Sequence, residues 1–280
     1  MHRTVPPSPE APTPQDHWIH HPRGRLFARS WTPAAALAGR PASPIVLLHH
    51  SLGCVELWRD FPTALAVATG RRVVAYDRLG FGRSDARPDR PSIDFVAQEA
   101  TGYFPAVREQ LALERFVALG HSVGGGMAIH CAVAFGDACE ALVTVAAQVF
   151  AEERTLEGIR AAREQFRDPA QVQRLARYHG ERTAWVLDAW IGNWLHPRFA
   201  DWHLLDVLPQ VRCPALALHG DQDEYGSTRH PTLIGERCGG PARVEILAQT
   251  GDLPHRERSK RVLRLVADFL AQHAPARGAE

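Results

Sequence analysis

One serine set between glycines, at the end of an apolar segment, constrains this 280-residue chain more than any other feature. Residues 115–119 form a short apolar run bounded by glycine, which is typical of a buried parallel strand, and residues 127–133 continue as a helix. Between them, residues 120–124 read Gly-His-Ser-Val-Gly. Because Gly-x-Ser-x-Gly between a strand and a helix forms a sharp turn that exposes the serine hydroxyl, we predict a nucleophile elbow centred on Ser122. A merely structural glycine turn is the alternative.

The chemistry of the predicted elbow explains its spacing. A strained turn lifts the hydroxyl of Ser122 clear of the sheet, and the flanking glycines leave room for backbone packed against backbone. The amide of Val123 lies at the start of the helix, where it can stabilise negative charge that develops on a carbonyl oxygen. These features favour a serine that attacks a substrate carbonyl.

The rest of the chain alternates apolar strand-like segments with helical segments, which indicates a mostly parallel sheet covered by helices on both faces. Two strands joined by a turn are expected to open it as an antiparallel hairpin. The predicted strands cover residues 16–20, 25–31, 45–49, 72–76, 115–119, 141–146, 214–219 and 242–247. The predicted helices include residues 57–69, 93–111 (capped by Ser92) and 256–272.

The alternation stops between about residues 150 and 212, where no convincing strand is found and four tryptophans occur. Some 60 residues of helix inserted between two strands suggest a lid over the active face. Most of these tryptophans are expected to form the core of the lid, and one or two to line an apolar substrate pocket. We therefore predict a core of residues 16–149 and 213–273, a helical lid of residues 150–212, and disordered tails of residues 1–15 and 274–280.

Composition and charge exclude several classes of function. The net charge of +1, without a run of Lys or Arg, argues against a nucleic-acid partner. The proline-rich residues 1–15 have no apolar core, so neither a signal peptide nor a membrane segment is expected. Five scattered cysteines predict a cytoplasmic chain with reduced thiols, and the histidines show no metal-ligand spacing. The glycine turn at residues 79–85 lacks the third glycine of a dinucleotide fingerprint, so we expect no cofactor and leave the oligomeric state open.

With these features in view, the chain resembles the α/β-hydrolase superfamily from about residue 16 to 273. Residues 47–62 and 221–226 are similar to small lidded members of the pimeloyl-ester carboxylesterase type. The resemblance implies an α/β-hydrolase fold, with an eight-stranded sheet, helices on both faces and a helical lid. It also implies an esterase that acts on a small-molecule substrate.

The resemblance assigns roles to individual positions. Ser122 matches the nucleophile, and the amides of Val123 and Ser51 match the two donors of the oxyanion hole. Asp223 matches the triad acid by its spacing after the seventh strand. The alternative acid position, after the sixth strand, holds Gln148, which supports Asp223 further.

One position departs from the family pattern. Relatives carry Gly-His-x-Pro-His-x-Glu after the eighth strand, and the first histidine is the general base. Residues 251–257 read Gly-Asp-Leu-Pro-His-Arg-Glu, so Asp252 stands where the base is expected. Losing one triad member typically costs about 10⁴- to 10⁶-fold in turnover. The departure therefore decides which chemistry is available.

Three hypotheses remain open. In the first, a loop shift brings His255 in as the base, and the chain hydrolyses an ester or related acyl bond of a small, largely apolar substrate. In the second, Asp252 beside Asp223 forms a carboxylate pair with one raised pKa, suited to elimination, isomerisation or cyclisation. In the third, the chain is a catalytically disarmed ligand-binding protein. The serine hydrolase is the preferred interpretation.

Overall fold

The computed structural model describes residues 11–34, 36 and 42–274. Of the predicted tails, residues 1–15 and 274–280, the segments 1–10 and 275–280 lie outside this part of the chain. Ordered structure extends slightly beyond the predicted core at both ends. The first strand begins at Pro14, and Ala274 is buried, with its carbonyl oxygen accepting a hydrogen bond from Arg71.

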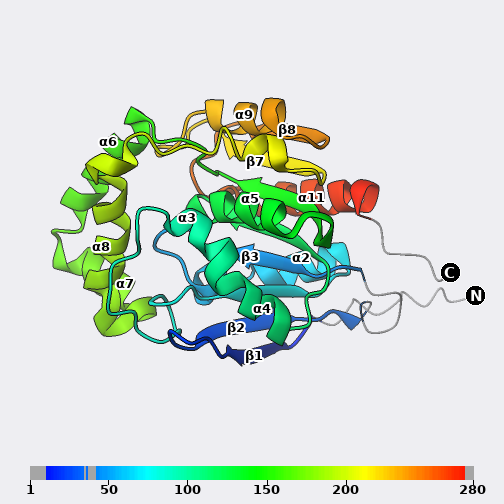
Figure 1. Ribbon diagram of the computed structural model, residues 1–280, viewed down its shortest axis with the longest axis horizontal. Coiled ribbons are helices and arrows are strands. Elements are labelled where there is room, and N and C mark those ends of the chain that lie inside the picture. The colour runs from blue at the N-terminus through cyan, green and yellow to red at the C-terminus, as the bar shows by residue number, and fades with distance from the viewer. Residues whose placement is uncertain (1–10, 35, 37–41, 275–280) are drawn as a thin grey trace, which may run out of the picture.

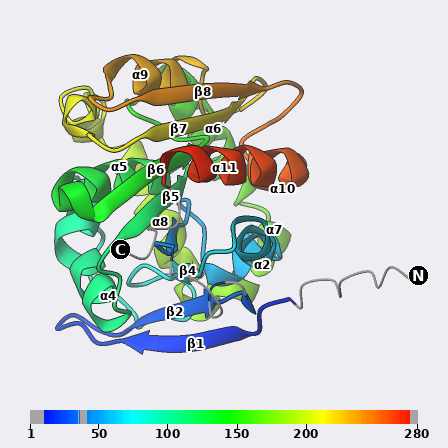
Figure 2. The same cartoon turned by 90° about the vertical axis from the view of Figure 1, so that its right-hand side faces the viewer.

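An eight-stranded sheet forms the centre of the molecule, in the order β1-β2-β4-β3-β5-β6-β7-β8 (Figures 1 and 2). The expected hairpin is present, because β1 pairs antiparallel with β2, and β2 also pairs antiparallel with β4. All other neighbours are parallel, which confirms the predicted mostly parallel sheet. The strands are β1 Pro14–Ile19, β2 Leu26–Trp31, β3 Ile45–Leu48, β4 Val73–Tyr76, β5 Phe116–His121, β6 Cys139–Val145, β7 Ala215–Gly220 and β8 Ala242–Leu247.

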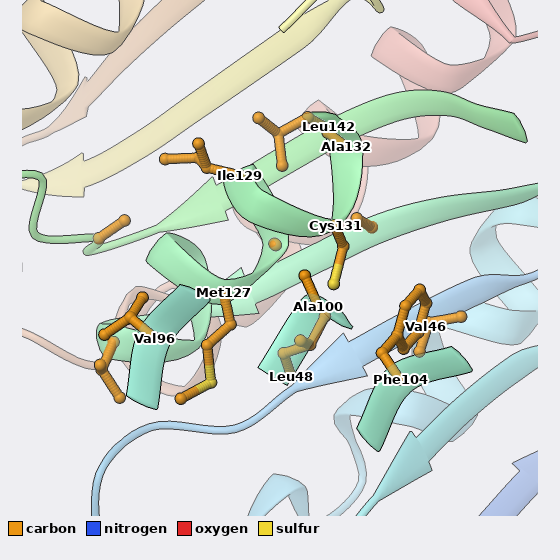
Figure 3. Packing of buried hydrophobic residues seen from close by; sticks show 14 of the residues in the cluster. Val46, Leu48, Val96, Ala100, Phe104, Met127, Ile129, Cys131, Ala132 and Leu142 are labelled. Atoms are coloured by element: carbon orange, nitrogen blue, oxygen red, sulfur yellow. The ribbon is translucent and has the colours of Figure 1, made fainter. Parts of the chain in front are cut away.

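Helices cover both faces of this sheet because alternate strand residues point to opposite sides. In β3, Ile45 and Leu47 pack on one side with α2 and α11, whereas Val46 and Leu48 pack on the other with α3, α4 and α5. Figure 2 shows α2 and α11 on one side and α4 and α5 on the other, and Figure 3 shows the packing around α5. The bounds are α2 Phe61–Thr69, α3 Phe95–Gln98, α4 Phe104–Gln110, α5 Val123–Phe135, α9 Arg229–Arg237 and α11 Ser259–His273.

Three of the predicted helices are interrupted. The predicted helix over residues 93–111 contains a π-helical turn, η2 Glu99–Tyr103, and its N-cap is Asp94 rather than Ser92. Pro105 follows this turn, and because a proline ring clashes with the carbonyl four residues earlier, the regular pattern cannot continue there. The helix predicted from residue 57 divides at Arg59, which has a φ of 53°. The closing helix divides into α10 Pro254–Glu257 and α11.

Three helices are inserted between β6 and β7, where the sequence predicted no strand. They are α6 Glu153–Gln165, α7 Pro169–His179 and α8 Thr183–Trp194. In Figure 1 they stand apart from the helices that cover the sheet. Within residues 150–212 the extended pairing is limited to one isolated bridge, between Phe150 and His203. Across the described residues, no helix is long and apolar enough to cross a membrane.

Candidate active site

Ser122 lies in the predicted strand-turn-helix, between β5 and α5. Its φ of 54° and ψ of −126° belong to a strained region for a residue other than glycine. The neighbouring glycines are required by close contacts. A Cβ on Gly120 would collide with the carbonyl oxygen of Gly124, and a Cβ on Gly124 would collide with the carbonyl oxygen of Leu48. The backbone therefore has the shape that the Gly-x-Ser-x-Gly pattern predicts.

The side chain of Ser122 opens onto a cavity of about 120 Å³ at the carboxyl ends of the strands. Loops that follow β3, β5, β6, β7 and β8 supply one part of its wall, and the inserted helices α6 and α8 supply the other. Two of the four tryptophans in the insertion, Trp190 and Trp194, line this cavity. The lining residues are His50, Ser51, Leu52, Ser122, Gln148, Thr155, Ile159, Trp190, Trp194, Tyr225 and Asp252.

Of the two residues assigned to the oxyanion hole, one lines this cavity and the other directly follows Ser122 in the chain. Ser51 lines it directly. Val123 is the first residue of α5, where a backbone N–H has no carbonyl acceptor within the helix. His50, which precedes Ser51 in the loop after β3, does not adopt a positive φ, so the backbone there does not need a glycine. The histidines that precede these positions contact backbone carbonyls, as His49 Nδ1 lies 2.8 Å from His50 O and His121 Nε2 lies 2.6 Å from Asp252 O.

The hydroxyl of Ser122 donates a hydrogen bond to Gln148 Oε1, at 3.0 Å. An amide oxygen orients a hydroxyl but is not a base at neutral pH, so this contact positions the serine without activating it. The sequence analysis considered Gln148 only as a position without an acid and missed this contact. The signal was available, because Gln148 follows the end of β6, and β6 is the parallel neighbour of β5.

Asp223 is completely buried in the loop after β7. Its Oδ1 accepts hydrogen bonds from the amides of Tyr225 (2.8 Å) and Gly226 (3.0 Å), whereas its Oδ2 has no hydrogen-bond partner among the described residues. His219 Nε2 lies 3.2 Å from that oxygen but bonds to Gly226 O, and burial lowers the pKa of His219 to about 4, which leaves the imidazole neutral. Burial raises the pKa of Asp223 to about 6, against the lowering effect of the two amides.

Asp252 lines the cavity, in the loop between β8 and α10. Burial, followed by the charges of Glu224, Asp223 and Glu257, raises its pKa to about 7, while Arg256 acts in the opposite direction. A neighbouring carboxylate makes ionisation more difficult, so this side chain exchanges a proton near neutral pH. The hydrogen bond of His121 to the Asp252 carbonyl fixes this loop beside the elbow.

His255 lies in a different environment. Its ring contacts those of His121, Trp58 and Phe61, with centroid distances of 4.7, 5.1 and 5.4 Å. The side chain is buried, its Nδ1 has no hydrogen-bond partner among the described residues, and burial lowers its pKa well below the ordinary value. It is not part of the cavity lining. The structure therefore brings Asp252 to the cavity beside Ser122 and places His255 in the aromatic packing behind it.

Comparison with known proteins identifies the family to which this fold belongs. The model of the alpha/beta hydrolase fold family matches residues 43–258. This chain belongs to the alpha/beta hydrolase fold family. As a family member it is 25% identical to the 2-hydroxy-6-oxo-2,4-heptadienoate hydrolase of Pseudomonas putida over 253 residues, which cover 82% of the chain and 89% of the relative.

Other known proteins share a shorter segment of sequence or the fold alone. The proline iminopeptidase of Lactobacillus helveticus is 37% identical over 86 residues, 31% of this hydrolase-fold chain and 29% of the relative. The match therefore spans less than a third of that relative. The crystal structure of the proline iminopeptidase of Mycobacterium smegmatis has a TM-score of 0.70 at 22% identity and covers 93% of this chain and 99% of its own. The enol-lactonase of Burkholderia xenovorans has a TM-score of 0.70 at 19% identity, with coverage of 91% and 100%.

The glycine turn at residues 79–85 packs against the buried side chain of Asp77 in this hydrolase fold. Asp77 accepts hydrogen bonds from the amides of Val55 (2.5 Å) and Arg83 (2.7 Å), and a Cβ on Gly82 would collide with its carboxylate. The turn thus wraps around a buried carboxylate. Over the part of the chain that the structure describes, no group of three or more His, Cys, Asp or Glu residues is arranged to hold a metal ion.

Proposed function

We propose that this hydrolase-family chain is an enzyme that cleaves an ester or related acyl bond of a small, uncharged molecule. In this proposal Ser122 is the nucleophile and Asp252 is the general base. The observation that carries it is that Ser122, at the elbow, and Asp252, with a pKa raised to about 7, line the same cavity. A base with a pKa near the working pH is the most effective proton acceptor.

The proposed reaction uses groups already in place. Ionised Asp252 takes the proton of Ser122, directly or through one water, while Oγ forms a bond to the carbonyl carbon. The amides of Ser51 and Val123 hold the resulting oxyanion. Protonated Asp252 then returns the proton to the leaving oxygen as the carbon–oxygen bond breaks, and water releases the acyl group by the same steps. Because a carboxylate is a weaker partner for serine than a triad imidazole, turnover is expected to be slow.

The cavity supports a substrate that is small and uncharged. Its volume of about 120 Å³ and the rings of Trp190, Trp194 and Tyr225 favour a compact apolar group. No Lys or Arg belongs to its lining, and carboxylates at Asp252 and Glu224 give it negative potential. An acyl group with its own carboxylate is therefore disfavoured.

The inserted helices support a role as a lid, because α6 and α8 contribute Thr155, Ile159, Trp190 and Trp194 to the cavity wall. A lid of this kind excludes water from the reacting carbonyl and strengthens the electrostatic contacts around it. We also propose a cytoplasmic site of action. All five cysteines are free thiols, which fits a reducing compartment.

A second function is favoured by one specific observation. The hydrogen bond of Ser122 goes to Gln148, and none connects Ser122 to Asp252. Asp252 could therefore act on the substrate itself, moving a proton in an elimination, isomerisation or cyclisation while the oxyanion donors bind the carbonyl. In that case Ser122 would bind substrate without forming a covalent bond.

Hydrolysis of p-nitrophenyl butyrate by purified variants tests the proposal. Wild type should show slow turnover, Ser122→Ala should lose it, and Asp252→Asn should lose at least about 10²-fold, the usual contribution of a general base. His255→Ala is the matched control and should retain the activity, since its ring lies outside the cavity. Activity that survives Ser122→Ala would overturn the serine mechanism, and loss of activity in His255→Ala would transfer the base to His255. A wild type that binds the ester without cleaving it would favour the second function or a disarmed binding protein.

A further inference from the structure

The carboxylate of Glu152 joins two segments that are 75 residues apart in the chain. Glu152 is the N-cap residue of α6, the first of the inserted helices. Its Oε1 accepts a hydrogen bond from the amide of Ser227 (2.6 Å), and its Oε2 accepts one from the hydroxyl of the same residue (2.9 Å). Ser227 belongs to the loop between β7 and α9, which also carries Asp223. The start of the insertion is therefore bonded to the loop that carries the buried acid.

His230 gives this carboxylate a third donor. Its ring is completely buried, in the first turn of α9, and its Nε2 lies 2.9 Å from Glu152 Oε1. Because the amide of Val149 donates to Nδ1 at 3.3 Å, Nε2 carries the proton and donates to Glu152. The ring of Phe150 packs against the same imidazole, with a centroid distance of 4.4 Å. Residues 149–152 thus hold His230 through both of its ring nitrogens.

These contacts keep Glu152 ionised. Burial acts to raise its pKa, but the hydrogen bonds from His230 and Ser227 outweigh burial and lower the pKa to about 2. A hydrogen bond to an ionised carboxylate is roughly twice as strong as one between neutral groups. Three such bonds from one side chain make a firm connection between the start of α6 and the loop after β7.

The same interface continues along α6 to the candidate active site. Thr155 Oγ1 donates a hydrogen bond to the carbonyl oxygen of Tyr225 at 2.6 Å, and both residues line the same cavity as Ser122. One turn further along the helix, a Cβ on Gly158 would lie 2.9 Å from the Tyr225 ring, so the helix and the ring are in close contact. A change in the position of α6 would therefore displace Thr155 and Tyr225 together.

Little apolar contact holds α6 in this position. Among its 13 residues, only Thr155, Ile159 and Ala162 are buried. A segment with few buried apolar contacts opens locally at a lower free energy than the core of a protein. The polar contacts of Glu152 therefore contribute a large share of what keeps this helix against the loop.

We propose that Glu152 is a positioning residue for the candidate active site. Its carboxylate fixes α6 to the loop after β7 and so sets where Thr155 and Tyr225 lie in the cavity wall. The inference rests on the proposed function, in which this wall binds the acyl group of the substrate. In the described part of the chain, no hydrogen bond joins Glu152 to Ser122 or Asp252. Its loss should therefore weaken substrate binding and leave the chemical step largely unchanged.

Amide hydrogen exchange of the full-length protein, without substrate, tests the positioning directly. In Glu152→Ala, residues 153–165 and 223–228 should exchange at least about tenfold faster than in wild type, as expected for the loss of a hydrogen bond to a charged group. Residues 116–121, which form the central strand β5, should keep their wild-type rate.

Two further variants calibrate this result. Glu152→Gln retains one acceptor oxygen, should give a smaller increase, and decides the question if Glu152→Ala does not fold. Glu153→Gln is the matched control, because Glu153 is the neighbouring residue and its carboxylate pairs with Arg160 at the surface. Its exchange rates should stay within about threefold of those of wild type.

Kinetics with p-nitrophenyl butyrate separate positioning from a general loss of stability. Glu152→Ala should raise KM at least about fivefold and leave kcat within about threefold of wild type, whereas Glu153→Gln should change neither. Unchanged exchange over residues 153–165 would overturn the proposal, and so would an unchanged KM. Equal acceleration of exchange in β5 would also overturn it, since the effect would then be a global destabilisation. If wild type does not hydrolyse the ester, the proposed function fails, while the exchange measurement still decides whether Glu152 fixes α6.

Discussion

Asp252→His tests the chemistry of the site most sharply, because it places a histidine at the position where the resemblance predicted the general base. The substituted imidazole would enter an environment prepared for a cation. Asp223 Oδ2 is buried without a hydrogen-bond partner, and Glu224 and Glu257 add negative charge nearby. An imidazole Nδ1–H that donates to Asp223 would fix the ring and leave Nε2 for Ser122.

The expected increase in kcat of Asp252→His follows from the same contacts. Burial is the largest cause that raises the pKa of Asp252 to about 7, and the charges of Glu224, Asp223 and Glu257 add to it. These charges disfavour an anion at this position and favour a protonated imidazole. A positioned general base contributes about 10²- to 10⁴-fold, so kcat for p-nitrophenyl butyrate should rise by at least about 10²-fold over wild type. The increase should be mainly in kcat, since the apolar lining of the cavity is unchanged.

The assay compares initial rates of ester hydrolysis at pH 7.5 for wild type, Asp252→His and a matched control, Glu224→His. The control places the same side chain on an exposed residue close to Asp252 and should leave the rate within about threefold of wild type. A rate in Asp252→His that does not exceed that of the control would refute this reasoning. It would mean that Ser122 and Asp223 are not aligned for a base at position 252.

Three further outcomes are expected. The folded-state pKa of Asp252 is raised from 3.8 to about 7, so the free energy of unfolding decreases as the pH rises from 3.8 through 7. Asp252→Asn removes this loss and should stabilise the protein at pH 8 by about 2 kcal/mol, and little at pH 4, in urea unfolding. Gln148→Ala should lower kcat about 3- to 10-fold with little change in KM, because Ser122 loses the bond that orients it, and an unchanged kcat would argue against this role. Gly124→Ala should destabilise the fold by about 3 kcal/mol through collision with the carbonyl at the end of β3, whereas Gly102→Ala, which has open space around it, should not.

The fold could be predicted from the sequence because its signals are local and mutually consistent. Apolar runs of four to six residues predicted the parallel strands, and the break in the alternation of strands and helices after β6 predicted the inserted helices. The helix interruptions were not predicted. The π-helical turn before Pro105 and the positive φ of Arg59 depend on how the backbone fits its neighbours, and hydrophobic periodicity does not record this.

The candidate site was predictable in its positions but not in its contacts. The elbow motif located Ser122, and strand order brought Asp223 and Asp252 to the same end of the sheet. Whether His255 could reach Ser122 depended on the packing of its ring against Trp58 and His121, which involves segments far apart in the chain.

Covalent labelling of Ser122 by diethyl p-nitrophenyl phosphate tests the central claim most directly, because the reagent reports on the nucleophile and its base without requiring the natural substrate. Peptide mass spectrometry should find one diethylphosphoryl group on Ser122. The labelling rate should rise with pH, with a midpoint near 7 as Asp252 ionises, and Asp252→Asn should be slow and lack this midpoint. Labelling at another residue, no labelling at any pH, or an unchanged midpoint in Asp252→Asn would contradict the account.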